Sequence, residues 1–341
     1  MKIALIGPGI MTIPPQGWGA VEILIWDYYN ELSKLNHEVI IINKIRNNPQ
    51  EQSNPNTPYC QELIKEINQG HYDFVHLHYD PLYHILQYLD TKTIGFTSHY
   101  PYIDNESKHN NDGFTHIFKF MLQNEFINNT HTKYTQTKYI NFVLAQKDIE
   151  FLIQKGADSK YLFLLENGID SNSFIFKEKG ELMNKTIYLG QINERKGQNK
   201  FCHLQNIDII GPNIDIVSNT TLINYKGSWS RNDVYNKLTE YGNLLLLSKG
   251  EADPLVVKEA LMSGLGVVIN STSSKNLLSN EFITIIEDEK MDDLNYIQTK
   301  IDENRNKSIL MRTEIRRYAE NTFSWTHFIT NYINNISNIG I

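Results

Sequence analysis

Two glutamates with seven residues between them, Glu251 and Glu259, are the groups in this sequence best placed to do chemistry. The first lies in a polar loop, and the second lies inside a predicted helix. A helix start carries unpaired backbone N–H groups and the positive end of the helix dipole, so it attracts a phosphate group. Here the N–H groups are those of Leu255, Val256 and Val257. Glu259 lies about 7 Å further along the helix axis, so we expect it to bind a ribose while Glu251 reaches a sugar beyond the phosphates.

A strand and a helix must position these glutamates. Residues 244–247 are four leucines, an apolar run that suits a strand buried on both faces of a parallel sheet. Asp253 has the chemistry of a helix N-cap, and Pro254 follows at the first helical position, where a missing N–H costs nothing. The helix is predicted to end just before Gly264, and a second apolar strand follows it.

This stretch resembles the Glu-x7-Glu motif of the retaining glycosyltransferases of the GT-B fold, most closely family 4. The usual form is Glu-x-Phe-Gly-Leu-Val-x-x-Glu-Ala, followed by a Gly. The residues that match are Glu251, Leu255, Val256, Glu259, Ala260 and Gly264. Asp253 and Pro254 replace the Phe-Gly pair, which removes one phosphate-facing N–H and adds a negative charge near the phosphates. We therefore expect Asp253 to point into its own helix turn as a cap.

Two cations form a second candidate group. Arg195 and Lys196 follow a predicted strand that ends in Gly190. The family has Gly-Arg-x4-Lys-Gly here, and in that motif the Arg and the Lys neutralise the donor diphosphate. Lys196 matches this Lys, but Gln191 takes the place of the Arg, so the resemblance implies that Arg195 supplies the missing charge. Composition alone favours an exposed, solvated pair instead.

The loop after the first predicted strand, residues 7–19, is rich in Pro and Gly. It lacks the tight Gly-x-Gly-x-x-Gly turn of nicotinamide-binding domains, which disfavours that class. Gly17, Gly19 and Glu22 match the Gly-x-Gly-x-x-Glu of family 4, which brings backbone close to the donor phosphates or the acceptor. The resemblance implies an acceptor site close to this loop, at Trp18 and its neighbours. Without the resemblance, an ordinary surface loop is an equally good interpretation.

Histidines mark the ends of two predicted strands. His99 lies at the edge where α/β proteins bind ligands, and it resembles the His that family members place against the donor sugar; we also expect it near the acceptor. A structural histidine is an equally open interpretation. His76 and His78 share one face of a strand, near Asp80 and His84, which invites a metal, but such alternation at a strand end is more often structural. The sequence contains no Asp-x-Asp motif, so we expect metal independence and no metal ligands.

The nucleotide base has one candidate contact. Tyr225 to Gly227 resembles the Tyr/Phe-x-Gly turn that contacts the base in this family. The expected catalytic residues are His99, Glu251 and Lys196. No cofactor is expected beyond the nucleoside diphosphate sugar itself, with a slight preference for a UDP-sugar.

Composition narrows the function classes. The chain has 341 residues and a net charge of −7, and it lacks a long basic run, so a nucleic-acid partner is not expected. Its two cysteines, Cys60 and Cys202, lie far apart, as is typical of a reducing compartment. The first strand meets Gly-Pro-Gly too early for a signal peptide, and no apolar run approaches a membrane span. We therefore expect a cytoplasmic protein.

Predicted strands alternate with helices along the chain, which favours parallel α/β sheets. The resemblance implies a GT-B architecture of two Rossmann-like parallel-sheet domains that face an interdomain cleft. Residues 1–170 would form the acceptor-side domain, residues 184–321 the donor-side domain, and a C-terminal helix at 322–338 would pack back on the first.

The function implied is transfer of a hexose, with retention, from a nucleoside diphosphate sugar to a glycan, lipid-linked or small-molecule acceptor. A sugar-nucleotide epimerase of the same fold and a non-catalytic sugar-nucleotide-binding remnant are the alternatives. A DNA-glucosylating enzyme shares the fold, but the acidic charge balance disfavours it. The oligomeric state and a peripheral membrane contact are left open.

Overall fold

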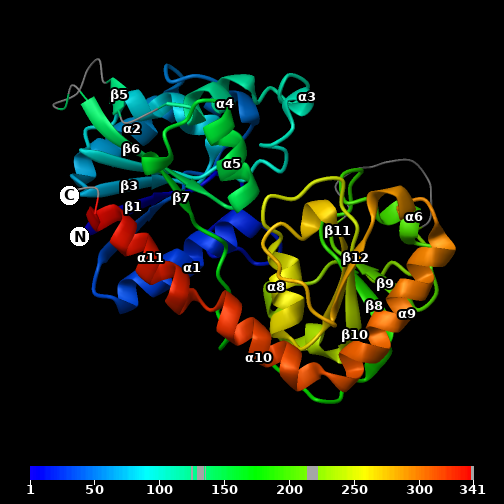
Figure 1. Cartoon of the computed structure of the whole chain (residues 1–341). Helices are drawn as coiled ribbons and strands as arrows, with labels where there is room; N and C mark the ends of the chain where they lie inside the picture. The colour runs from blue at the N-terminus through cyan, green and yellow to red at the C-terminus, as the bar shows by residue number, and fades with distance from the viewer. Residues whose placement is uncertain (124–125, 129–133, 135, 213–221, 339–341) are drawn as a thin grey trace. The chain divides into compact units, whose positions relative to one another are not determined.

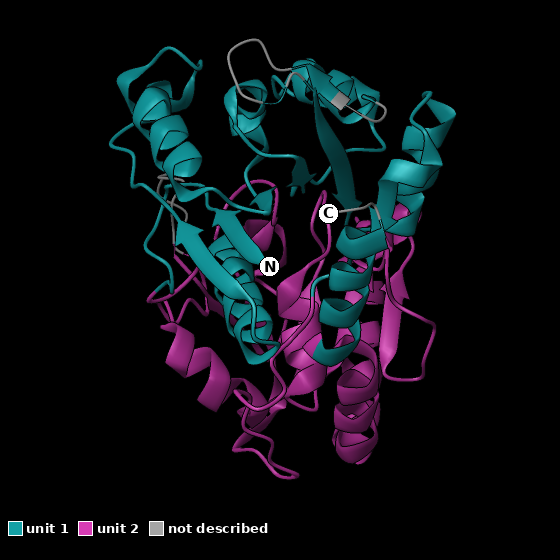
Figure 2. Ribbon diagram, turned by 90° about the vertical axis from the view of Figure 1, so that its left-hand side faces the viewer, with its two compact units in different colours: residues 1–15, 19–167, 326–341 teal, residues 16–18, 168–325 magenta. Residues whose placement is uncertain are grey.

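The structure is a computed structural model that describes residues 1–123, 126–128, 134, 136–212 and 222–338 (Figure 1). The chain divides into two compact units (Figure 2). Unit 1 comprises Met1–Pro15, Gly19–Asn167 and Thr326–Ile341, and unit 2 comprises Gln16–Trp18 and Gly168–Trp325. The chain therefore leaves unit 1 after Asn167 and returns to it at Thr326.

Unit 1 is built on a sheet with the strand order β2-β1-β3-β4-β6-β5, and β7 also pairs with β6. All of these pairs are parallel except β5 with β6. The strands are β1 (Lys2–Ile6), β2 (Glu38–Ile42), β3 (Phe74–Leu77), β4 (Thr93–Phe96), β5 (Phe126–Asn128), β6 (Gln136–Val143) and β7 (Leu162–Leu164). β3 and β4 are buried along their whole length, as expected for central strands covered on both faces.

The helices of unit 1 include one that comes from the far end of the chain. They are α1 (Ala20–Lys34), α2 (Pro58–Gly70), α3 (Glu106–His109), α4 (Thr115–Met121), α5 (Gln146–Gln154) and α11 (Trp325–Asn338), with short 3-10 segments η1 (Pro49–Gln52), η2 (Asp80–Tyr88) and η3 (Ser159–Tyr161). α11 lies beside α1 (Figure 1), where the rings of Tyr332 and Tyr28 are 5.2 Å apart. Tyr332 also bonds through its hydroxyl to Nδ1 of His76 at 2.9 Å, which fixes α11 against the sheet.

Unit 2 has a fully parallel sheet with the order β12-β11-β10-β8-β9. Its strands are β8 (Leu182–Leu189), β9 (Ile207–Ile210), β10 (Tyr241–Leu246), β11 (Gly266–Asn270) and β12 (Ile283–Ile286). Its helices are α6 (Gln198–Phe201), α7 (Arg231–Lys237), α8 (Leu255–Met262), α9 (Leu294–Leu310) and α10 (Arg312–Phe323), with 3-10 segments η4 (Leu238–Glu240), η5 (Ser271–Ser273) and η6 (Asp288–Lys290). The expectation of parallel α/β architecture is confirmed in both units.

The C-terminal helix expected over residues 322–338 begins at Trp325 instead, because Ser324 between α10 and α11 has extended backbone. Among the described residues, no helix combines the length and the apolar character needed to cross a bilayer.

Candidate functional site

Three predicted site residues of unit 2 meet at one carboxylate oxygen. Oε1 of Glu251 accepts hydrogen bonds from Nζ of Lys196 at 2.6 Å and from Arg195 at 3.1 Å. Arg195 also donates to the carbonyl of Gly250 at 2.5 Å. The interpretation of Arg195 and Lys196 as a solvated surface pair is wrong for Lys196, whose side chain is only 11% exposed. Two cations from the loop after β8 therefore face one anion, Glu251, on the loop that leads into α8.

The loop that carries the two cations is tied to the loop after β10. The hydroxyl of Tyr188, on β8, donates to the carbonyl of Lys196 and accepts from the N–H of Leu247. The N–H of Lys249 donates to the carbonyl of Arg195 at 2.8 Å. These bonds join two segments that follow neighbouring strands, so the cations are held by backbone as well as by Glu251.

Burial and ion pairing shift the pKa values of Lys196 and Glu251 in opposite directions. Burial lowers the pKa of Lys196, although the charge of Glu251 opposes that shift. For Glu251, burial would raise the pKa, but the charges of Lys196 and Arg195 outweigh it and the pKa is lowered. Glu251 is therefore an anion at neutral pH, and any anionic ligand that enters must compete with it for the cations.

The start of α8 differs from the prediction. Pro254 is the N-cap residue and Leu255 is the first helical residue. The prediction that Pro254 is the first residue of the helix is therefore wrong. The N-cap residue makes no side-chain cap hydrogen bond, and Asp253 lies one position before it, so the prediction that Asp253 is the N-cap is wrong. The N–H of Val257 bonds to the carbonyl of Pro254 at 3.1 Å, which removes it from the predicted set of free donors and leaves Leu255 and Val256.

Asp253 makes a different bond from the one predicted. Its Oδ2 accepts from Nζ of Lys258 at 2.7 Å, and both side chains are 2% exposed. The ammonium group of Lys258 also lies 5.3 Å from the centre of the Phe323 ring. A buried carboxylate needs such a partner, and a lysine five residues later on the helix supplies it. The negative charge of Asp253 is thus neutralised by Lys258, instead of capping the helix start.

The other end of α8 is capped by a glycine and two arginines. Gly264 has a φ of 81°, in the left-handed region that a terminating glycine adopts, so this prediction is confirmed. Arg312 donates to the carbonyl of Ser263 at 3.3 Å, and Arg316 donates to that of Met262 at 2.5 Å. Cations at a helix C-terminus complement its dipole.

Glu259 has a partner that the sequence did not reveal. Its Oε1 accepts from Arg231, the first residue of α7, and the Glu259 side chain is 5% exposed. Burial disfavours the charge of Arg231, but the neighbouring Glu259 outweighs burial and raises the pKa of Arg231. No sequence motif singled out Arg231, because it lies 28 residues before Glu259 and only the packing of α7 brings it close.

The predicted glycines cluster at the ends of β8 and β9. Gly190 donates to the carbonyl of Ile210, and Gly211 donates to that of Gly227 at 3.0 Å. A Cβ on Gly211 would lie 1.9 Å from the carbonyl oxygen of Gly190, so only glycine allows this approach. The structure therefore joins Gly190 and Gly227 through Gly211, a residue that sequence reasoning did not name as a site.

The Pro-Gly loop divides between the units. Gln16–Trp18 group with unit 2, whereas Gly19 is the N-cap of α1 in unit 1, with a φ of 121°. The carbonyl of Gln16 accepts from the N–H of Arg231 at 3.1 Å, and Trp18 is 40% exposed. Gly17 and Trp18 thus lie in the unit that carries Glu259, whereas His99, expected beside them, belongs to unit 1.

The carboxyl edge of the unit 1 sheet holds buried histidines. The rings of His76 and His78 are 3.9 Å apart, and those of His78 and His99 are 6.1 Å apart. Burial lowers the pKa of all three, that of His99 to about 4. Both ring nitrogens of His78 and Nε2 of His99 are buried and have no hydrogen-bond partner among the residues that the structure describes. These histidines are neutral at physiological pH. Within the described part of the chain, no three His, Cys, Asp or Glu residues are placed to hold a metal.

Asp80 lies in the same region of unit 1. Its carboxylate accepts from the hydroxyl of Ser98 at 2.6 Å. Burial raises the pKa of Asp80 to about 6, against the effect of that hydrogen bond.

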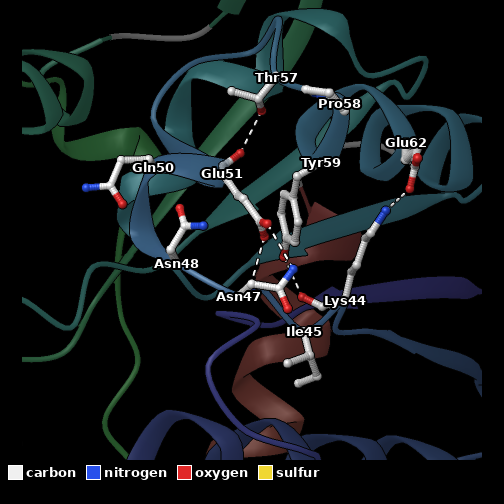
Figure 3. Close-up of a pocket in the computed structure, with 10 residues that line it drawn as sticks. All are labelled: Lys44, Ile45, Asn47, Asn48, Gln50, Glu51, Thr57, Pro58, Tyr59 and Glu62. Atoms are coloured by element: carbon white, nitrogen blue, oxygen red, sulfur yellow. Dashed lines mark hydrogen bonds and ion pairs between the residues drawn. The ribbon is translucent and has the colours of Figure 1, made fainter.

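A separate hollow of about 460 Å³ lies beyond the end of β2 in unit 1 (Figure 3). It is lined by Lys44, Ile45, Asn47, Asn48, Gln50, Glu51, Thr57, Pro58, Tyr59 and Glu62. Several of these groups bond to one another: Lys44 pairs with Glu62, and Asn47 donates to Glu51 (Figure 3). None of the predicted site residues lines this hollow, so the candidate site remains at the sheet edges.

Comparison with known proteins places the fold. No protein-family model matches the chain, and no curated protein matches it in sequence. Solved structures do match over almost the whole chain. HepE from Anabaena, in complex with UDP-glucose, aligns with a TM-score of 0.73 and 11% identity over 99% of this chain and 100% of its own. Sucrose-phosphate synthase from Thermosynechococcus elongatus aligns with a TM-score of 0.71 and 12% identity over 99% of this chain and 98% of its own.

A third match is WaaG, a glycosyltransferase involved in lipopolysaccharide biosynthesis, with a TM-score of 0.63 and 14% identity over 93% of this chain and 95% of its own. The chain has the GT-B fold. In this GT-B fold, the charged groups described above lie on unit 2 and the buried histidines lie on unit 1.

Proposed function

We propose that this chain is a glycosyltransferase that moves a hexose from a nucleoside diphosphate sugar to a glycan, lipid-linked or small-molecule acceptor, with retention of configuration. The observation that carries the proposal is the convergence of Arg195 and Lys196 on one oxygen of Glu251, on the loop that leads into α8. The structural neighbours include HepE bound to UDP-glucose, which favours a UDP-sugar among the donors.

The donor diphosphate would rest on the two cations and on the free N–H groups at the start of α8. Transfer of a glycosyl group builds positive charge on the sugar ring and negative charge on the departing phosphate. Arg195, Lys196 and the helix dipole stabilise that negative charge. Because side-chain cations do this, we propose that the reaction is independent of a metal ion. The charge of Asp253 does not oppose the phosphates, because Lys258 already neutralises it.

The rest of the donor would follow the same unit. Glu259 would accept hydrogen bonds from the ribose, Glu251 would bind sugar hydroxyls, and the turn at Gly227 would contact the base. For retention, we propose same-face attack assisted by the leaving phosphate, with no protein nucleophile. His99, neutral because burial lowers its pKa to about 4, would contact a sugar hydroxyl as a neutral group.

A thermal-shift panel of UDP-, GDP-, ADP- and TDP-sugars tests the proposal, because a ligand that binds only the folded chain raises its melting temperature. The sugar nucleotide that binds is then incubated with candidate acceptors in the presence and absence of EDTA, and the anomeric configuration of the product is measured by NMR. A shift with none of the donors would contradict the proposal. Isomerised donor without acceptor would favour the epimerase instead.

A further inference from the structure

Glu259, the carboxylate proposed above to bind the ribose, is hydrogen-bonded through one of its two oxygens. Arg231 donates to Oε1 of Glu259, and the two side chains are 13% and 5% exposed. Among the residues that the structure describes, Oε2 of Glu259 has no hydrogen-bond donor. A buried carboxylate has about four lone-pair sites and is normally bonded at both oxygens. The pair therefore presents one oxygen that a further donor can use.

Arg231 is itself fixed by its surroundings. Its guanidinium carbon lies 4.3 Å from the centre of the Tyr235 ring and 5.5 Å from that of Phe174. Its backbone N–H donates to the carbonyl of Gln16. These contacts hold the cation in one place, so the carboxylate bound to it is also oriented.

Stability alone does not explain this arginine. Its Nε is buried and has no hydrogen-bond partner in the described part of the chain, and a buried donor without an acceptor lowers stability. The pair lies in the same stretch of unit 2 as the buried contacts of Glu251 with Lys196 and of Asp253 with Lys258. The arginine is therefore kept beside Glu259 at a cost in stability, as expected for a pair that serves binding.

We propose that Arg231 is a positioning residue for nucleotide recognition: by holding Oε1 of Glu259, it directs Oε2 to the 2′-hydroxyl of the donor ribose. The inference rests on the proposed function, because it assumes a ribonucleotide donor on unit 2. It predicts that Arg231 controls discrimination between ribose and 2′-deoxyribose. A hydrogen bond from a hydroxyl to an oriented carboxylate is stronger than one between neutral groups, so the wild-type chain is expected to bind the ribonucleotide about tenfold more tightly.

The experiment compares UDP with 2′-deoxy-UDP, and likewise the GDP and ADP pairs, by isothermal titration calorimetry. In Arg231→Met, Glu259 loses its orientation, so the ratio of the two dissociation constants is expected to fall to within about threefold of one. Glu259→Gln should lower the ratio similarly, and Arg231→Lys, which keeps a cation beside Glu259, should recover part of it. Lys237→Met is the matched control: it removes an exposed cation of the same helix, paired with Asp233 at 2.7 Å, and should leave the ratio unchanged.

The double variant Arg231→Gln with Glu259→Gln leaves no unpaired buried charge, so its binding can be measured even if Arg231→Met does not fold. It should bind the ribonucleotide and the 2′-deoxyribonucleotide with equal affinity. If Arg231 only stabilises the fold, its substitutions weaken both ligands by the same factor, and an unchanged ratio overturns the inference. A wild-type ratio of about one also overturns it. If no nucleoside diphosphate binds the wild-type chain, the proposed function fails, and this inference fails with it.

Discussion

The two units have the same kind of sheet, yet the groups buried at their carboxyl edges differ in charge. In unit 1, the edge holds His76, His78 and His99, and burial lowers the pKa of each so that they are neutral. In unit 2, the corresponding edge holds the ion pair of Glu251 with Lys196, and the pKa of Glu251 is lowered, so this carboxylate remains charged. A parallel sheet thus provides a place for a site, while the side chains at its edge decide whether that place suits a neutral or a charged ligand.

The largest expected effect concerns the buried pair of Asp253 and Lys258. Lys258→Met leaves the Asp253 carboxylate buried without its cation, so we expect a loss of about 3–5 kcal/mol in the free energy of unfolding. Adding Asp253→Asn to Lys258→Met removes the unpaired charge and should restore most of that loss. Urea unfolding measures both variants. A loss below about 1 kcal/mol in the single variant would show that the pair contributes little.

The next effect concerns catalysis. Lys196→Ala removes a cation from the proposed phosphate site, and loss of one preorganised donor of this kind is expected to lower kcat by about 100- to 1000-fold. Steady-state turnover of the sugar nucleotide identified by thermal shift measures it. Lys200→Ala is a suitable control, since Lys200 is an exposed residue that pairs with Asp292 at 2.5 Å. Equal kcat values in the wild type and in Lys196→Ala would show that Lys196 has no role in catalysis.

Acidification should affect the stability of the two units differently. The folded-state pKa values of His76, His78 and His99 lie below 6.5, so the unfolded chain takes up protons first and stability falls as the pH drops from 6.5 towards about 4. Asp80, with its pKa raised to about 6, acts in the opposite direction. The pKa of Glu251 is lowered, so its contribution persists until the pH is below 4.5. Between pH 7 and pH 5 we therefore expect a net loss of stability from the three histidines of unit 1, partly offset by Asp80.

Urea midpoints at pH 7 and pH 5 test this expectation. His99→Asn removes one of the titrating groups and should reduce the loss, whereas Glu251→Gln should leave it unchanged. Equal loss in the wild type and His99→Asn would show that the histidine edge is not responsible.

The smallest effect concerns His78. Within the described part of the chain, both of its ring nitrogens are buried without a hydrogen-bond partner, and replacing such a group by an apolar one of similar shape is close to neutral. His78→Phe should therefore change the free energy of unfolding by less than about 1 kcal/mol, as measured by urea unfolding. A loss above about 2 kcal/mol would mean that these nitrogens bind a group in the folded protein.

Local sequence patterns predicted much of the fold because local physics decides it. β1, at Lys2–Ile6, ends directly before the loop predicted at residues 7–19. Gly264 ends α8 as predicted, because a left-handed residue is needed there. The cap at Asp253 was wrong for a physical reason: its capping chemistry was real, but Lys258 competes for the same carboxylate and the pair is buried together.

By itself, the sequence determined where the buried strands lie, where α8 ends and which carboxylates and cations are candidates for a phosphate site, since these depend on neighbours within about two helical turns. Only the tertiary structure decided the partners of those groups. Lys196 meets Glu251 across 55 positions and Arg231 meets Glu259 across 28, and both contacts form because separate elements of one sheet unit pack together. Burial then makes each pairing matter, because a charge removed from water is stable only beside its counter-charge.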